Sequence, residues 1–499
     1  MAFERSFKKV DKKNAYSQLE KANLFVKEHK KYVNPKYRLV YHLMGEYGWI
    51  NDPNGFIYFN GIYHCFYQHN PFNSCWGPTY WGHAISEDLV KWQYLPIALA
   101  PDSEYDKDGC FSGSAIEKDG KIYILYTGHV KKSDEEYMQT QCLAWSTDTI
   151  NFIKYEGNPV IGLDKIPGGA SKKDFRDPKV FKRGDKYYVL VASKDLNGKG
   201  QILFYESHNL IDWNFVNILF KSDIDREHIL ECPDFFSIDN KDVLIFSIQY
   251  IENNKVVRSE TRYCTGLIDW NKGVFNLEYC DLIDYGTHFY APQTTLGKNG
   301  CRVMIAWMDV WEREFPTHKL GHNWAGALIL PREIYLKGNK LFFRPIKEIE
   351  KYRKNEQIFE GVLEGEHIRL PLEDNCFELD MTAEFFVNTE MNLELLSRED
   401  SGNDLIKLTF KYSFGVLELT VTIRDSVNNN ENQSLLIDSL SSRLNLRLFM
   451  DKSSLEMFIN EGEKVITKRV YPFKKYDLIN ISSQNACKVR LKKWNLQIT

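Results

Sequence analysis

The sequence predicts an all-β protein: a five-bladed β-propeller, followed by a C-terminal β-sandwich and preceded by a short N-terminal helix. Two short motifs, each recurring roughly every 60 residues between residues 37 and 335, predict the propeller, because a fixed period of this length is typical of repeat architectures. The period is lost after residue 335, and the short alternating strands that follow predict the separate sandwich.

A helix is expected within the N-terminal lead-in, residues 1–36. Residues 11–34 are rich in helix-forming residues, and apolar side chains recur at helical spacing from Leu19 to Val26. Pro35 follows this stretch and predicts where the helix ends.

The first recurring motif is a hairpin turn followed by a strand of alternating apolar residues. Asn-Gly and Asp-Gly pairs, which favour type I′ turns, begin three of its five copies. The turns are at Asn60-Gly61, Asp119-Gly120, Gly184-Asp185, Asn240-Lys241 and Asn299-Gly300. Five copies predict five blades.

The second motif begins with Ser or Cys and ends with Trp or Phe. Its four copies keep the phase of the turns, at residues 86–92, 146–152, 207–213 and 264–270. Two independent motifs in one phase favour a propeller over a β-sandwich with coincidental turns.

Two further segments follow the propeller. Residues 336–356 include the charged stretch 347–356 and are expected to form a linker. Residues 357–499 contain short alternating strands without the 60-residue period and predict the β-sandwich.

Three acidic residues occupy nearly the same position in three of the repeats. Asp52, Asp177 and Glu231 precede the turns of the first, third and fourth repeats by seven to nine residues, and proline follows each acid directly or after one residue. Because the first strand of each blade lines the central channel, the three acids should meet at one mouth of that channel. The alternative is that they cap turns on the surface.

Glycoside hydrolysis is the chemistry that such a cluster serves. One carboxylate attacks the sugar or activates water, and a second protonates the leaving oxygen. A third can hold substrate hydroxyls beside Arg176 through charge-assisted hydrogen bonds. The corresponding positions of the second and fifth repeats hold Phe111-Ser112 and Tyr290. The spacing alone does not assign a role to each acid.

Seven motifs spread over nearly the whole chain form a highly specific combination. They are WINDPNG (49–55), FYQHNP (66–71), FSGSA (111–115), FRDP (175–178), ECPD (231–234), DYGTHFYAPQ (284–293) and SSLEMFINEGE (453–463). Together they resemble glycoside hydrolase family 32, the β-fructofuranosidases, which comprise invertases, fructanases and sucrose-6-phosphate hydrolases.

This resemblance implies a retaining double displacement. Asp52 would be the nucleophile that captures the fructosyl C2, and Glu231 the general acid and then the general base. Asp177 would stabilise the transition state beside Arg176. Retention requires the carboxyl groups of Asp52 and Glu231 to lie about 5–5.5 Å apart. We expect no cofactor and no metal, because the acid motifs lack the number and spacing of metal ligands.

The resemblance also implies the walls and hydroxyl partners of a sugar pocket. They are Asn51, Gln68, Trp76, Phe111, Ser112, Arg176 and Trp307. For Trp76 and Trp307, packing in the core is an equally good interpretation.

Within the family, residues 101–116 and 311–333 are similar to intracellular bacterial sucrose-6-phosphate hydrolases. This favours sucrose or its 6-phosphate over polymeric fructan, and a phosphate would need a cation at the rim of the pocket. The candidate cations are Arg313, His318, Lys319 and His322. His288 stands where the family usually carries an acid, so the leaving-group subsite is left open.

Other functions remain open on the same residues. A fructosyltransferase or an exo-fructanase would use the same three acids on the same scaffold. A non-catalytic sugar-binding protein is disfavoured by the presence of all three acids. An inverting arabinan or xylan hydrolase is disfavoured by the motif at 49–55 and by the C-terminal sandwich.

Composition argues against several classes of protein. A net charge of −4 without a long basic run disfavours nucleic-acid binding, and no apolar run of about 18 residues predicts a membrane span. The first residues lack the apolar region of a secretory signal. The ten cysteines form no CxxC pair and predict buried free thiols rather than a disulfide framework. A cytoplasmic protein that binds a small sugar is expected.

Overall fold

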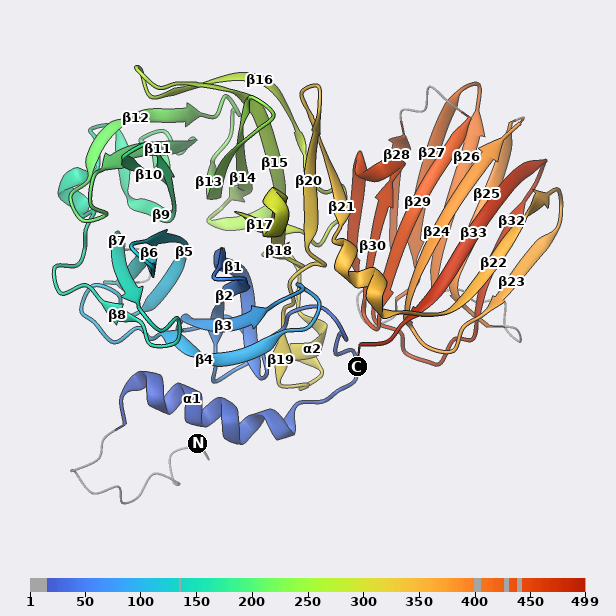
Figure 1. Cartoon of the computed structure of the whole chain (residues 1–499), viewed down its shortest axis with the longest axis horizontal. Helices are drawn as coiled ribbons and strands as arrows, with labels where there is room; N and C mark the ends of the chain where they lie inside the picture. The colour runs from blue at the N-terminus through green and yellow to red at the C-terminus, as the bar shows by residue number, and fades with distance from the viewer. Residues whose placement is uncertain are drawn as a thin grey trace.

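The computed structural model describes residues 16–133, 136–386, 388–398, 405–425, 430–437 and 442–498. β-strands predominate in this part of the chain, as predicted, and they form seven sheets. Figure 1 shows five sheets grouped on one side and two on the other. Residues 1–15 of the predicted N-terminal lead-in lie outside the described residues.

The predicted N-terminal helix is α1 (Gln18–His29). Ser17 caps it: the Oγ atom of Ser17 accepts from the backbone N–H of Glu20, and the Glu20 carboxylate accepts from the backbone N–H of Ser17. Ala22 is buried against Ile97 of the first sheet, and Figure 1 shows α1 running beside that sheet. No helix among the described residues is long and apolar enough to cross a membrane.

Five sheets lie N-terminal to residue 346. The first contains β1 (Gly48–Phe59), β2 (Ile62–Asn70), β3 (Tyr80–Ser86) and β4 (Gln93–Leu99), and β19 (Trp324–Ala325) pairs in parallel with β1. The second contains β5 (Gly109–Lys118), β6 (Lys121–Lys131), β7 (Tyr137–Ser146) and β8 (Ile153–Lys154). The third contains β9 (Ala170–Arg183), β10 (Lys186–Asp195), β11 (Gly200–Ser207) and β12 (Asn214–Lys221). The fourth contains β13 (His228–Ile238), β14 (Lys241–Glu252), β15 (Lys255–Asp269) and β16 (Val274–Leu282). The fifth contains β17 (Tyr290–Leu296), β18 (Arg302–Trp307), β20 (Arg332–Lys337) and β21 (Lys340–Pro345).

Each of the five predicted turns joins the first two strands of one sheet, which confirms the repeated hairpin. Asn60 and Gly61 have φ angles of 48° and 86°, a region that Asn and Gly tolerate best. In the fourth sheet the turn lies one residue earlier than predicted, at Asp239 and Asn240, because Lys241 already begins β14.

The first strands of the five sheets contact one another in cyclic order: β1 with β5, β5 with β9, β9 with β13, β13 with β17, and β17 with β1. Figure 1 shows these strands at the inner ends of their sheets. Equivalent positions on the five strands are therefore brought close together.

Part of the predicted linker belongs to the fifth sheet. Residues 336–345 lie in β20 and β21, and only a short 3₁₀ turn (Lys347–Tyr352) separates them from the next sheet. The repeat period failed to reveal these strands because a long insertion precedes them. Residues 308–331 contain α2 (Pro316–Lys319) and β19, so the third strand of this sheet comes late in the sequence.

Two six-stranded sheets follow and enclose one apolar core, in agreement with the predicted sandwich. One contains β22 (Arg353–Leu363), β33 (Cys487–Leu496), β24 (Cys376–Phe385), β29 (Arg443–Asp451), β30 (Ser454–Ile459) and β31 (Lys464–Arg469). The other contains β23 (His367–Pro371), β32 (Leu478–Ser483), β25 (Thr389–Ser397), β26 (Ile406–Ser413), β27 (Val416–Ile423) and β28 (Glu431–Ile437).

Buried ion pairs join the sandwich to the preceding sheets. The guanidinium of Arg332 lies 2.9 Å from Asp284 and 2.9 Å from Glu456 of β30, and all three side chains are buried. Because a buried charge is costly without its partner, these contacts fix the sandwich against the fifth sheet. Figure 1 shows β30 beside β21.

One cysteine pair corrects the prediction that all thiols are free. Cys264 and Cys280 form a disulfide between β15 and β16, where they are direct cross-strand partners with Cα atoms 4.1 Å apart. The sequence did not reveal the pair because its register depends on the sheet. The other eight cysteines are free.

Candidate active site

The three predicted acids line one cavity of about 800 Å³. Asp52, Asp177 and Glu231 come from β1, β9 and β13, and each is mostly buried. The predicted pocket residues that also line it are Asn51, Gln68, Trp76, Phe111, Ser112 and Arg176. The acids therefore converge, as their equivalent positions in the repeat predicted, and do not cap surface turns.

A β-bulge lies at the level of this cavity in each of the five inner strands. Strand pairing is interrupted between Ile50 and Pro53, Phe111 and Gly113, Arg176 and Lys179, Glu231 and Asp234, and Tyr290 and Gln293. Within the bulges, Asp177, Cys232 and Ala291 have φ angles of 61°, 47° and 50°. Bulge positions are unpaired, so proline loses no ladder hydrogen bond there. This explains Pro178 and Pro233, which lie within the bulges, whereas Pro53 directly follows its bulge and is opposite Tyr67.

Asp52 is held by three side chains. Ser112 Oγ donates to Asp52 Oδ2 over 2.7 Å, Asn51 Nδ2 donates to Oδ1 over 3.0 Å, and Cys232 Sγ lies 3.4 Å from Oδ2. Burial and, to a smaller extent, the charge of Glu231 raise the pKa of Asp52 to about 6, although the hydrogen bond from Ser112 opposes this increase. The carboxyl group is thus oriented and ready to ionise near neutral pH.

Backbone hydrogen bonds and the charges of neighbouring side chains determine the environment of Asp177. The N–H of Cys232 donates to Asp177 Oδ2 over 3.0 Å, and the N–H of Asp177 donates to Thr127 Oγ1 over 2.9 Å. Burial, together with the charges of Glu231 and Asp52, raises the pKa of Asp177 to about 7, although Arg176 opposes this increase.

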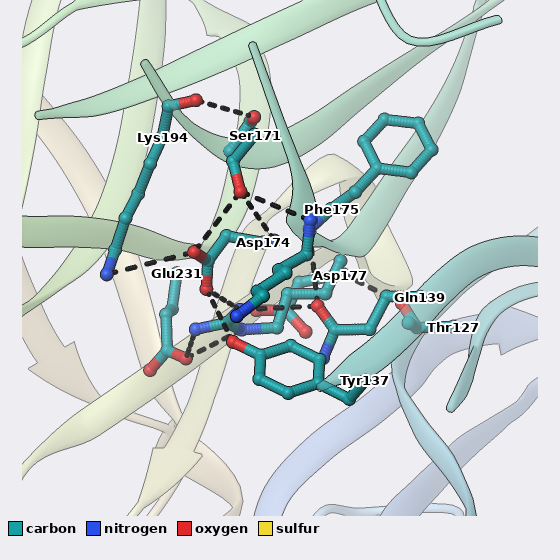
Figure 2. Close-up of polar contacts among 12 residues, drawn as sticks. Thr127, Tyr137, Gln139, Ser171, Asp174, Phe175, Asp177, Lys194 and Glu231 are labelled. Atoms are coloured by element: carbon teal, nitrogen blue, oxygen red, sulfur yellow. Dashed lines mark hydrogen bonds and ion pairs between the residues drawn. The ribbon is translucent and has the colours of Figure 1, made fainter. Parts of the chain in front are cut away.

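Glu231 is bound on both carboxylate oxygens. Tyr290 Oη donates to Oε2 over 2.8 Å, and Arg176 Nε donates to Oε1 over 2.9 Å. Arg176 in turn donates from Nη1 to Asp174 Oδ1 over 3.0 Å. Figure 2 shows Asp174, Tyr137 and Gln139 around this network, in which Tyr137 donates to Asp174 and Arg176 donates to Gln139. These contacts fix the position of the Glu231 carboxylate.

Some of these residues were not predicted. Tyr290 was recognised only by its place in the fifth repeat, although it donates directly to Glu231. Asp174 lies two residues before Arg176, on the same side of β9. This spacing is the one feature of the sequence that could have predicted its contact with Arg176. Nothing in the sequence pointed to Tyr137, Gln139 or the cavity-lining Trp311.

The two predicted tryptophans have different environments. Trp76 is 54% exposed and lines the cavity. Trp307 is fully buried behind the cavity wall, where it packs against Trp49, Trp311 and Phe315. The structure therefore places Trp307 in the core, which agrees with the interpretation that this residue packs there and does not stack on sugar.

None of the predicted phosphate cations lines the cavity. Arg313 pairs with Glu431, Lys319 with Glu314, and His318 with Ser74, while His322 is buried elsewhere. His288 is also buried outside the lining, next to Thr287. Among the described residues, Lys131 and Lys255 also line the cavity, and both are exposed.

Nearly the whole chain matches the two domains of one family. The N-terminal domain model of glycosyl hydrolases family 32 matches residues 42–345, and the C-terminal model of that family matches residues 348–497. The chain belongs to glycosyl hydrolase family 32. This confirms the resemblance seen in the motifs.

Relatives of this family 32 glycosidase have similar length. The chain is 36% identical to a sucrose-6-phosphate hydrolase of Escherichia coli over 456 residues, covering 87% of this chain and 89% of that protein. It is 33% identical to a sucrose-6-phosphate hydrolase of Bacillus subtilis over 493 residues, covering 97% and 98%. A solved β-fructofuranosidase of Bombyx mori in complex with sucrose superposes with a TM-score of 0.79 at 32% identity, covering 96% and 97%.

Proposed function

We propose that this β-fructofuranosidase hydrolyses sucrose or sucrose-6-phosphate by a retaining double displacement. The observation that carries the proposal is the convergence of Asp52, Asp177 and Glu231 in one cavity, with each carboxylate bound by neighbouring donors. The names of the two bacterial relatives and the sucrose complex of the Bombyx mori enzyme support a sucrose-type substrate.

Asp52 acts as the nucleophile. The donors Ser112 and Asn51 hold its carboxyl group toward the cavity, so that an oxygen of Asp52 attacks C2 of the fructosyl ring. Glu231 protonates the departing glycosidic oxygen, and it then removes a proton from the water that releases fructose from Asp52. Both groups return to their starting protonation states.

Asp177 and Arg176 bind the fructosyl ring. Asp177 accepts from ring hydroxyls, and these charge-assisted bonds strengthen as positive charge develops on the ring in the transition state. Arg176 keeps the Glu231 carboxylate at a fixed place beside them.

The five N-terminal sheets form the blades of a propeller, with β1, β5, β9, β13 and β17 around its axis. The cyclic contacts of these strands support this arrangement. We assign residues 37–345 to this catalytic domain and residues after the 3₁₀ turn at Lys347–Tyr352 to the sandwich. The linker is thereby reduced to that turn.

Lys131 and Lys255 bind the phosphate of sucrose-6-phosphate. Both line the outer cavity, where the leaving glucosyl unit projects away from the acids. A cation at this place stabilises a phosphate without touching the fructosyl site, so its contribution differs between the two substrates.

Initial rates on sucrose and on sucrose-6-phosphate, measured side by side, test the proposal. We expect fructose release from both substrates by the wild type and almost none by Glu231→Gln. Lys255→Gln should lower kcat/KM several-fold on sucrose-6-phosphate and leave sucrose unchanged, whereas the exposed control Lys272→Gln should affect neither. No fructose from either substrate would favour fructans or a non-catalytic sugar-binding protein, and oligosaccharides as the main product at high sucrose would indicate a fructosyltransferase.

A further inference from the structure

A second cavity, of about 290 Å³, lies further along the inner strands that carry the acids. Lys179 and Thr294, which line it, follow Asp177 and Tyr290 by two and four residues. At about 3.3 Å per residue this places the second cavity roughly 7–13 Å beyond the active site along the strands. It therefore lies on the other side of the bulges and is a separate site.

Positive charge dominates this cavity. Among the described residues that line it, none is acidic and four are cationic. The cationic residues are Lys179, Lys182, Arg183 and Arg302. Ser237, Thr294 and Thr295 also line it, but the hydroxyl groups of Ser237 and Thr294 already donate to Asp242 and Asp234. The cations without a lining acid are suited to an oxyanion.

Of these four cations, Lys179 alone forms an ion pair with an acid in the described part of the chain. Its Nζ lies 2.7 Å from Oδ2 of the buried Asp234, and Asp234 is also bound by the N–H and hydroxyl of Thr294. The ammonium group of Lys179 and the N–H and hydroxyl of Thr294 are therefore all directed at Asp234. The other cations remain available to a ligand.

Arg302 is the most informative of these cations. It is partly buried, its guanidinium lies 4.8 Å from the ring centroid of Phe236, and its side chain makes no hydrogen bond or ion pair with the residues that the structure describes. Burial lowers the pKa of Arg302, and the charge of Asp234 offsets this only in part, so the guanidinium is poorly solvated. Arg183 is similar: its guanidinium lies over Trp270 at 4.0 Å. An aromatic ring positions each of these two guanidinium groups, so the N–H groups of both remain available to donate hydrogen bonds to a ligand.

We propose that this cavity binds a phosphate group, held by the guanidinium groups of Arg302 and Arg183. Paired guanidinium donors match the geometry of phosphate oxygens better than lysine does. The volume accommodates inorganic phosphate or the phosphate of a small sugar phosphate. The site is distinct from the leaving-group region at Lys131 and Lys255, because the two sets of residues line different cavities.

Thermal unfolding in millimolar phosphate, compared with chloride at the same ionic strength, tests the proposal. The wild type and Asp52→Asn should both be stabilised by inorganic phosphate, because a ligand that binds only the folded protein raises its unfolding midpoint. Arg302→Gln should weaken phosphate binding about tenfold or more, since hydrogen bonds to charged groups are lost. Glucose-6-phosphate, assayed in the same way, distinguishes a free phosphate ligand from a sugar phosphate.

Three variants besides Arg302→Gln distinguish this cavity from other phosphate sites: Arg183→Gln, Arg226→Gln and Lys255→Gln. Arg183→Gln changes an exposed residue and should fold even where Arg302→Gln does not, and it should also weaken binding. Arg226→Gln removes a comparable arginine that lies over Tyr250 and does not line this cavity, and this variant should bind phosphate normally. Phosphate binding that survives both Arg302→Gln and Arg183→Gln but is lost in Lys255→Gln would overturn the proposal, as would the absence of any phosphate-specific stabilisation.

Discussion

Arg176 donates to Oε1 of Glu231 from Nε over 2.9 Å, and its Nη2 lies 2.8 Å from the same oxygen. This contact joins β9 to β13 within the cavity. Burial alone would lower the pKa of Arg176, but Glu231, Asp174 and Asp177 raise it well above its ordinary value. The guanidinium is therefore permanently charged and directs the Glu231 carboxylate.

Arg176→Lys should lower kcat/KM on sucrose by about a hundredfold, because an ammonium group cannot bind Glu231, Asp174 and Gln139 in one plane. Because lysine keeps the positive charge, the loss of activity measures the contribution of the planar guanidinium group. Arg183→Lys, outside the active site, is the matched control and should retain full activity. Equal activity of Arg176→Lys and wild type would show that the guanidinium group of Arg176 is not needed to position Glu231.

The rate of hydrolysis should fall as the pH drops below about 6. Asp52 must be ionised to attack, and burial raises its pKa to about 6. The apparent value belongs to the interacting acids together, since Asp177 and Glu231 are close. Ser112→Ala removes a hydrogen bond that lowers the pKa of Asp52, so it should move the acid limb of the kcat/KM profile to higher pH. An acid limb near pH 4 in both proteins would contradict this account.

Asp52→Asn should abolish activity and yet stabilise the fold at pH 7. The pKa of Asp52 is about 6 in the folded protein, against 3.8 for an aspartate in water, the value expected of the unfolded chain. The folded protein thus retains a proton that the unfolded chain has lost between these values, and stability falls as the pH rises through this range. Removing the ionisable group should raise the free energy of unfolding at pH 7 by roughly 1–3 kcal/mol, with no gain near pH 4. Chemical denaturation at both pH values measures this, with the exposed turn variant Asp119→Asn as control. A gain of equal size at both pH values would refute the assigned cause.

The two tryptophans should respond differently to replacement by alanine. Trp76→Ala should raise KM with little change in stability, because the indole is half exposed on the cavity wall. Trp307→Ala should cost about 3–5 kcal/mol of stability, as expected for a large buried side chain. Steady-state kinetics and thermal unfolding of both variants separate the roles. A stable Trp307→Ala protein with a raised KM would instead assign Trp307 to the sugar site.

Much of the site could be predicted because repetition encodes it. Equivalent positions of a repeated unit lie close together, so the spacing of Asp52, Asp177 and Glu231 from their turns predicted one shared cavity. The prolines were noticed as a pattern, but the bulges that accommodate Pro178 and Pro233 could be recognised only from the strand pairing.

The remaining features depend on contacts between distant segments. Tyr290 donates to a residue 59 positions away, and Gln139 accepts from residues 36 and 37 positions away. Whether Trp307 faces sugar or core depends on which side of β18 it occupies, and aromatic content cannot reveal this. The rim lysines were missed because attention fell on residues 311–333, whereas Lys131 and Lys255 lie at strand ends that approach only in the folded chain.

Hydrolysis of sucrose in aqueous methanol tests the retaining mechanism most directly. A covalent fructosyl intermediate on Asp52 exposes one face of the sugar to the incoming alcohol, so methanol captures the intermediate with the configuration of the substrate. The product, methyl fructofuranoside, does not change its anomeric configuration in solution and can be assigned by NMR. We predict methyl β-D-fructofuranoside, and formation of the α anomer would contradict the double displacement.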